Sequence, residues 1–146
     1  MDHVAIMQRS WGLLPKVLSG EKTIESRWYM QRRAPWNGVH AGDAVYFKNG
    51  GEPVSAMARV SHVLQFGDMG PLQVRELLET YGGQDGLVPE EIPAFYDRFK
   101  AKRYCILVFL EGAVPVSPFW IDKTGFGAQA AWLTVGSIDE LRQGRV

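Results

Sequence analysis

The sequence predicts a small α+β domain, built as a mixed, mostly antiparallel β-barrel with helices in the crossovers. Three observations predict it. Residues 43–48 and 54–66 are rich in valine and aromatic residues on either side of a glycine-containing turn, which is typical of a hairpin. Residues 104–110 form a continuous apolar run, short enough to be a strand buried on both faces. Residues 71–81 place apolar residues at helical spacing, so the fold class combines strands and helices.

The first elements are predicted from a change in the spacing of apolar residues along the chain. Residues 4–7 predict a short opening strand, and residues 10–20 predict a helix that ends at Gly20. Residues 23–29 are compatible with a strand. Residues 32–42, which contain proline and glycine, predict a loop.

The middle of the chain holds the clearest signals. Residues 49–51, Asn-Gly-Gly, supply the positive φ angles that a turn between strands 43–48 and 54–66 needs. The helix at residues 71–81 has proline at its start and glycine after its end, which are the usual boundary residues. A hairpin followed by a helix is therefore expected.

The remaining elements complete the sheet. Residues 89–100 predict a second helix, and the apolar run 104–110 predicts the strand at the centre of the sheet. Residues 131–135 indicate a further strand. The sequence from Ser137 to Glu140 has the form of a capping box that opens a short terminal helix.

Composition predicts one folded domain over residues 1–146. Hydrophobic residues make up 46% of the chain and charged residues 22%, which is ordinary globular usage. The single Cys105 excludes an intramolecular disulfide, and the first residues lack a secretory pattern, so we expect a cytoplasmic location. No apolar run reaches the roughly 20 residues that span a bilayer, and no membrane association is expected.

Charge is unevenly distributed although the net charge is zero. A net charge of zero argues against binding nucleic acid through a broad basic surface. However, residues 64–97 carry one Lys/Arg against seven Asp/Glu, and residues 98–110 carry four against none. A local basic face could hold a short single strand, and the alternative is an ordinary solvated helix surface.

The densest group of charged residues lies in the segment from Gly20 to Arg27. In a strand Glu25 and Arg27 share a face, so the carboxylate could hold the guanidinium in one orientation for a phosphate or a base edge. Lys22 could reach the same space as a point charge or, with a depressed pKa, as a proton acceptor. The alternative is a structural ion pair beside a solvated lysine.

The pattern Gly20-x-Lys22-x-x-Glu25-x-Arg27 resembles the signature of the ASCH domain, a family of the PUA-like superfold whose members are linked to RNA. The resemblance extends over most of the chain. It includes Gly42-Asp43, the hairpin 45–63, Pro118 to Lys123, Gly125-Phe126 and Trp132.

The resemblance implies a pseudo-barrel with a cleft beside the first helix, into which Lys22 and Glu25 point. ASCH-like relatives include amidohydrolases acting on an acylated cytidine, ribonucleases, and modules that only bind RNA or regulate. The amidohydrolase branch would place a threonine nucleophile where this chain has Glu25, which counts against that mechanism. Thr23 and Ser26 lie beside it, but a strand turns at least one of them away. Glu25 could instead act as a general base, with Lys22 or Arg27 stabilising developing negative charge.

Aromatic residues bracket the motif. Trp11, Trp28 and Trp36 could stack on a base, although core packing is the alternative for each. Trp11 is the best candidate for an exposed ring, because it follows Ser10 at the start of a predicted helix, where backbone donors face solvent.

Other candidates lie further along the chain. Lys48 is at the hairpin edge and could reach the cleft, or could simply block strand pairing. Lys123 and Phe126 lie in a glycine-flanked segment that could close over the cleft or be a plain surface loop. The three histidines are scattered, so we predict no metal site and no other cofactor. Cys105 is expected to be a buried structural thiol.

The sequence therefore predicts a module that binds RNA or a modified nucleoside in a polar cleft. The expected ligand-binding residues are Ser10, Trp11, Lys22, Glu25, Arg27, Lys48, Lys123 and Phe126. The alternative is a small hydrolase, a ribonuclease or nucleoside amidohydrolase, with Lys22 and Glu25 catalytic in the same cleft. A third hypothesis, a protein-interaction module using the acidic residues 68–97, ranks last, and protein partners are not predicted.

Overall fold

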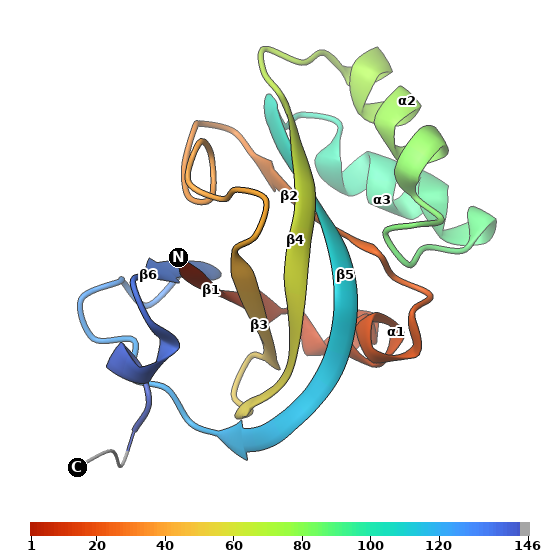
Figure 1. Ribbon diagram of the computed structural model, residues 1–146. Coiled ribbons are helices and arrows are strands. Elements are labelled where there is room, and N and C mark those ends of the chain that lie inside the picture. The colour runs from red at the N-terminus through yellow and green to blue at the C-terminus, as the bar shows by residue number, and fades with distance from the viewer. Residues whose placement is uncertain (144–146) are drawn as a thin grey trace.

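The computed structural model describes residues 1–143 and contains a six-stranded sheet that curls into a half-barrel (Figure 1). The strands lie in the order β2-β5-β4-β3-β1-β6, with β1 and β3 parallel and all other neighbours antiparallel. They are Asp2–Met7 (β1), Ile24–Tyr29 (β2), Ala44–Asn49 (β3), Val54–Phe66 (β4), Tyr104–Phe119 (β5) and Trp132–Val135 (β6). The predicted α+β class, the mostly antiparallel sheet and the β3–β4 hairpin are confirmed.

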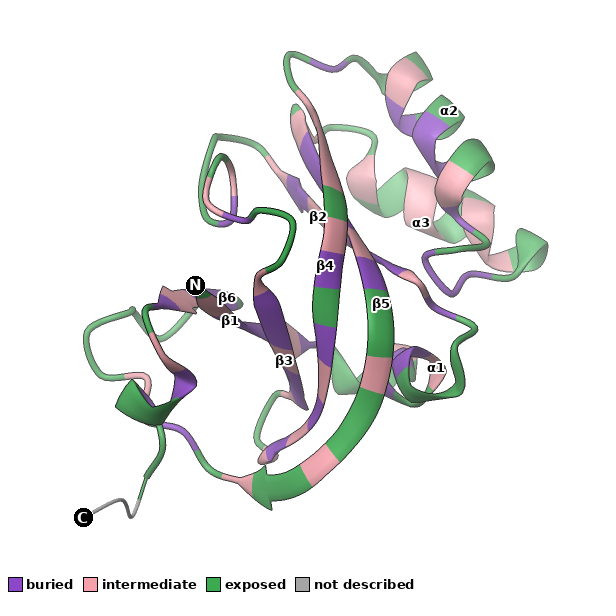
Figure 2. Ribbon diagram, viewed as in Figure 1, coloured by how far each residue is buried: buried purple, intermediate pink, exposed green. Residues whose placement is uncertain are grey.

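Strand β5 differs from the prediction in position and length. It is the second strand from the β2 edge, so its predicted place at the centre of the sheet is wrong. Residues 105–108 are fully enclosed as expected, but the strand continues to Phe119 along β4 with several register shifts. Most of that second half is exposed (Figure 2) and contains two prolines, so no apolar run marks it in the sequence.

The helix predicted over residues 10–20 is wrong in its first part. A 3-10 turn, Arg9–Trp11, comes first, and helix α1 spans only Leu14–Ser19. Gly12 separates the two with φ +65°, a left-handed conformation that cannot continue a right-handed helix. Gly20, at φ +84°, ends α1 as predicted.

Two further helices connect β4 to β5. Helix α2 spans Pro71–Tyr81, as predicted. The predicted helix 89–100 is a 3-10 turn followed by α3, Ile92–Phe99. The expected terminal helix is only a 3-10 turn, Ile138–Glu140, because the chain then turns so that Arg142 bridges to Ile121. None of the helices in residues 1–143 has the length and apolarity to cross a membrane.

The larger hydrophobic core lies between the sheet and the helices. It includes Val17 of α1, Phe47 of β3, Leu78 of α2 and Ile106 of β5, all nearly or fully enclosed. Cys105 belongs to this core, and burial raises the pKa of its thiol well above the ordinary value, as expected for an unreactive structural cysteine.

Candidate functional site

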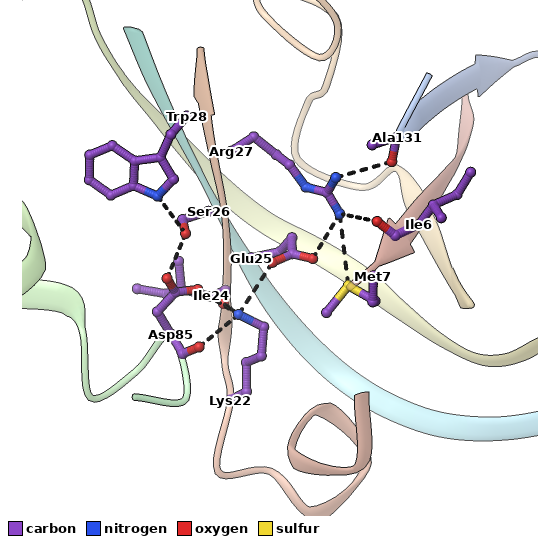
Figure 3. A network of polar contacts seen from close by, with 10 residues as sticks. All are labelled: Ile6, Met7, Lys22, Ile24, Glu25, Ser26, Arg27, Trp28, Asp85 and Ala131. Carbon is purple, nitrogen blue, oxygen red and sulfur yellow. Dashed lines mark hydrogen bonds and ion pairs between the residues drawn. The ribbon is translucent and has the colours of Figure 1, made fainter. Parts of the chain in front are cut away.

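A buried ion network lies where strand β2 meets the turn after α2 (Figure 3). The Lys22 ammonium donates to the backbone oxygens of Ile24 and Asp85, both at 2.7 Å, and to Asp85 Oδ1 at 2.5 Å. It also lies 3.3 Å from Glu25 Oε1, and its side chain is 0% exposed. Lys22 therefore holds two carboxylates and a strand carbonyl together from inside the protein.

Glu25 links this lysine to Arg27. Glu25 Oε2 accepts a hydrogen bond from Arg27 Nη2 at 3.1 Å, so the pair predicted from strand spacing is present. The guanidinium also donates to the backbone oxygens of Ile6, at 3.3 Å, and Ala131, at 3.1 Å. Because those oxygens belong to β1 and to the residue before β6, Arg27 ties β2 across the open side of the half-barrel.

A second branch of the network ends at the tryptophan of β2. Ser26 Oγ donates to Asp85 Oδ2 at 2.5 Å, and Trp28 Nε1 donates to Ser26 Oγ at 3.0 Å. Trp28 stacks on Phe99 of α3, with ring centroids 5.0 Å apart and planes within 7°. The polar network is thus fixed to the aromatic side chains beside it.

The protonation of these groups follows from burial and from their partners. Burial alone lowers the pKa of Lys22, but the charges of Asp85 and Glu25 outweigh burial and raise it. Burial raises the pKa of Glu25, but Lys22 and Arg27 outweigh burial and lower it. The pKa of Asp85 is raised, because burial and the charge of Glu25 outweigh Lys22. Lys22 is therefore a fixed cation and a poor proton acceptor, and Asp85 is the carboxylate best suited to accept a proton.

A cavity of about 220 Å³ opens beside this network. Its polar lining residues are Gln8, Glu25, Ser26, Arg27 and Asp85. Its apolar walls combine the aromatic residues Trp11, Trp28, Tyr29, Phe95 and Phe99 with aliphatic residues, among them Met7, Leu13 and Leu87. Flat apolar walls beside charged groups suit a flat ligand that has polar edges.

The free edge of β2 adds backbone groups to this cavity. Ile24 N–H donates to Gln84 O at 3.0 Å and Ile24 O accepts from Lys22, so the backbone of Ile24 points away from β5. Backbone direction alternates along an antiparallel strand, and Ser26 and Trp28 therefore point the same way. Both residues line the cavity, and their backbone groups are not used in pairing with β5.

The structure brings together part of the predicted ligand-binding set. Glu25, Arg27 and Trp11 line the cavity, with Trp11 half-buried against Phe95. Lys22 lies behind the cavity surface and is not among the lining residues, because its ammonium is enclosed by the carboxylates. The idea that Lys22 accepts a proton through a depressed pKa is wrong, because its pKa is raised.

The other predicted ligand-binding residues lie elsewhere. Ser10 is exposed in the 3-10 turn, and Phe126 is 37% exposed in the loop before β6. Lys48 is on the face of β3 opposite the core residue Phe47, and Lys123 donates to Ala130 O at 2.9 Å. None of these four lines the cavity.

Sequence reasoning missed Asp85, which completes the network. Its local signal is weak: an aspartate within a glycine-rich turn, Gly82 to Gly86. Gly86 has φ +91°, and a Cβ there would lie 3.2 Å from Leu13 Cδ2 and 3.3 Å from Lys22 Cβ. The glycine thus lets the turn close over Lys22. Of the two hydroxyl residues beside Glu25, Ser26 lines the cavity and Thr23, which precedes β2, does not.

Comparison with known proteins identifies the fold. No protein-family model matches the sequence, and no curated protein matches it. Among solved structures, the crystal structure of an ASCH protein from Zymomonas mobilis matches with a TM-score of 0.63 and 16% identity, covering 92% of this chain and 87% of that one. A variant of the same protein with a serine replaced by alanine matches with a TM-score of 0.64 and 17% identity, again covering 92% and 87%.

The chain therefore has an ASCH-like fold of the PUA-like class, and the resemblance predicted from the Lys22, Glu25 and Arg27 motif is confirmed for the fold.

Proposed function

We propose that this protein binds RNA or a modified nucleoside by taking one unpaired nucleobase into the cavity beside β2. The observation that carries the proposal is a set of aromatic walls next to a polar surface and an open strand edge. Unpaired bases are recognised by stacking on aromatic rings and by hydrogen bonds to their edges. The volume of about 220 Å³ is below the roughly 300–1,000 Å³ of sites for drug-sized ligands, which favours a single ring system.

The polar groups define how such a base would be held. The carboxylates of Glu25 and Asp85 accept hydrogen bonds, and the backbone of Ser26 and Trp28 offers both donors and acceptors. Lys22 and Arg27 keep the two carboxylates in place, so the site is organised before the ligand arrives. Preorganisation of this kind reduces the cost of binding.

The test is a titration of a nucleoside panel, read by tryptophan fluorescence and calorimetry, with Trp11→Leu and the control Trp120→Leu. Trp120 is 51% exposed and does not line the cavity. Loss of one stacking ring is expected to weaken binding by about 5- to 100-fold, whereas Trp120→Leu leaves binding unchanged. Absence of binding by every nucleoside, or equal affinities of the two variants, would overturn the proposal.

A hydrolase is the second candidate function, and one contact favours it. Ser26 Oγ donates to Asp85 Oδ2 at 2.5 Å, beside the cavity, and Asp85 has a raised pKa. A hydroxyl paired with a proton acceptor is the arrangement of an activated nucleophile. Glu25 is less suited to be the base, because its pKa is lowered and Lys22 and Arg27 hold its two oxygens.

Mass spectrometry separates the two candidates. Short RNAs and a pool of acylated and unmodified nucleosides are incubated with the protein, with Ser26→Ala and with Asp85→Asn. Product that disappears in both variants would establish the hydrolase. Unchanged substrates, together with measurable nucleoside binding, would exclude the hydrolase for these substrates and support the binding function.

A further inference from the structure

Six cations gather at the end of the sheet where β2 stops and β5 starts. They are Arg32, Arg33, Arg98, Lys100, Lys102 and Arg103, here called the basic patch. The register pairs Tyr29, at the end of β2, with Tyr104, at the start of β5, and Arg103 N–H donates to Tyr29 O at 2.9 Å. Two segments far apart in the sequence therefore meet at one end of the molecule (Figure 1).

Most of this charge is not neutralised by neighbouring residues. Lys100 lies 3.5 Å from an oxygen of Asp97, and Arg103 lies 4.0 Å from an oxygen of Asp68, with all four side chains more than half exposed. Such surface pairs are weak. The other four cations have no carboxylate within 4.0 Å among residues 1–143.

Aromatic rings lie between the cations. The Arg32 guanidinium is 5.7 Å from the centroid of Trp36 and 5.6 Å from that of Tyr104. A surface of arginines and lysines interleaved with aromatic rings is typical of proteins that hold single-stranded nucleic acid, where cations contact phosphates and rings stack on bases.

The basic patch adjoins the cavity. Arg33 lies 5.4 Å from the ring centroid of Tyr29, and Arg98 lies 5.0 Å from that of Trp11. Both rings line the cavity. A strand with one base in the cavity would therefore have cations within reach of its neighbouring phosphates.

We propose that the basic patch binds the phosphates of a single-stranded nucleic acid whose base occupies the cavity. The part of this inference that places a base in the cavity rests on the proposed function. The phosphate-binding role of the basic patch rests on its charge and its location. The preferred ligand is then a strand of several nucleotides rather than a free nucleoside. The acidic residues of the chain concentrate in residues 64–97, so zero net charge is compatible with a cationic patch.

The test uses a fluorescein-labelled single-stranded RNA of eight nucleotides and mixed sequence, titrated at several salt concentrations. The double variant Arg32→Gln/Lys102→Gln removes two patch charges, and neither residue lines the cavity. The matched control is Arg59→Gln/Arg75→Gln, two exposed arginines outside the patch. Free-nucleoside affinity is measured for both variants.

The patch variant is expected to bind the RNA about tenfold more weakly and to lower the slope of log affinity against log salt by about 1.4, since each lost phosphate contact accounts for about 0.7. Its nucleoside affinity and the RNA binding of the control variant should not change. Equal RNA binding by both variants would overturn the proposal that the basic patch binds phosphates, and it would leave the proposed nucleoside site unaffected. The same titration is made with a duplex of this RNA and with polyglutamate, and equal affinity for either would also overturn the proposal, because the basic patch would then not select a single strand.

The failure of each proposal is distinguishable. RNA binding that depends on the patch, with no nucleoside binding at all, would support the patch and contradict the base site. Nucleoside binding, together with RNA binding that the patch substitutions do not change, would support the base site and contradict the role of the basic patch.

Discussion

Replacing Lys22 by methionine tests whether the buried network is held by charge. The substitution keeps an unbranched side chain of similar length but removes every hydrogen bond that the ammonium makes. Glu25 keeps Arg27 as a partner, whereas Asp85 keeps only Ser26. Removing one partner of a buried ion pair costs about 3–5 kcal/mol, because the charge left behind is not compensated. We expect a loss of this size in the free energy of unfolding at pH 7, measured by urea denaturation.

The dependence of this loss on pH follows from the pKa directions. In the wild type the folded pKa of Glu25 is lowered, so its contribution is present above its ordinary value and is lost as pH falls. In the variant, Asp85 has no cation and its folded pKa, already raised, rises further. A raised carboxyl pKa adds stability as pH falls, and the Glu25 contribution of the wild type is lost below its ordinary value, so the difference between the two proteins should shrink between pH 7 and pH 4.

Two further variants complete this experiment. Asp85→Asn in the Lys22→Met background removes the orphaned charge and should recover part of the loss. Lys100→Met removes an ammonium that is 52% exposed and should change stability by less than about 0.5 kcal/mol. A loss below about 1 kcal/mol for Lys22→Met, or a loss that is the same at pH 4 and pH 7, would contradict a network held by charge.

Three other perturbations have defined outcomes. Gly86→Ala places a Cβ at φ +91° against Lys22 and should lower the unfolding free energy by about 1–3 kcal/mol in urea denaturation, whereas an unchanged midpoint would contradict the close approach. Burial lowers the pKa of His3, whose Nδ1 accepts from Trp132 Nε1 at 3.1 Å, so stability should fall as pH drops below about 6.5; a His3→Gln variant with the same pH dependence would contradict this. The Cys105 thiol should react with Ellman's reagent only after unfolding, and rapid labelling of the native protein would show that it is not enclosed.

Local patterns predicted the elements whose signals lie within a few residues. Helix α2 and the β3–β4 hairpin are marked by their own boundary residues and periodicity. The helix expected over residues 10–20 failed because Gly12 adopts φ +65°, which sequence periodicity does not reveal. The second half of β5 was missed because pairing with β4, rather than an apolar pattern, keeps it extended.

The candidate site was likewise predictable only where its residues lie close together in the sequence. Glu25 and Arg27 are two residues apart, so strand geometry alone predicted their contact. Asp85 is 63 positions from Lys22, and only the packing of the α2–α3 turn brings them together. The sequence also assigned no fixed role to Lys22, because the direction of its pKa depends on that distant carboxylate.

The connection between β4 and β5 has a consequence for how this fold can diverge. These two strands are hydrogen-bonded neighbours, so a tight turn could join them and residues 67–103 are topologically an insertion. The insertion nevertheless supplies Asp85, one of the two counter-charges of Lys22, which belongs to the segment between α1 and β2. Lineages that shorten or replace the α2–α3 turn therefore have to replace Lys22 as well. In an alignment of homologous chains, lysine at position 22 and a carboxylate at position 85 should be gained and lost together.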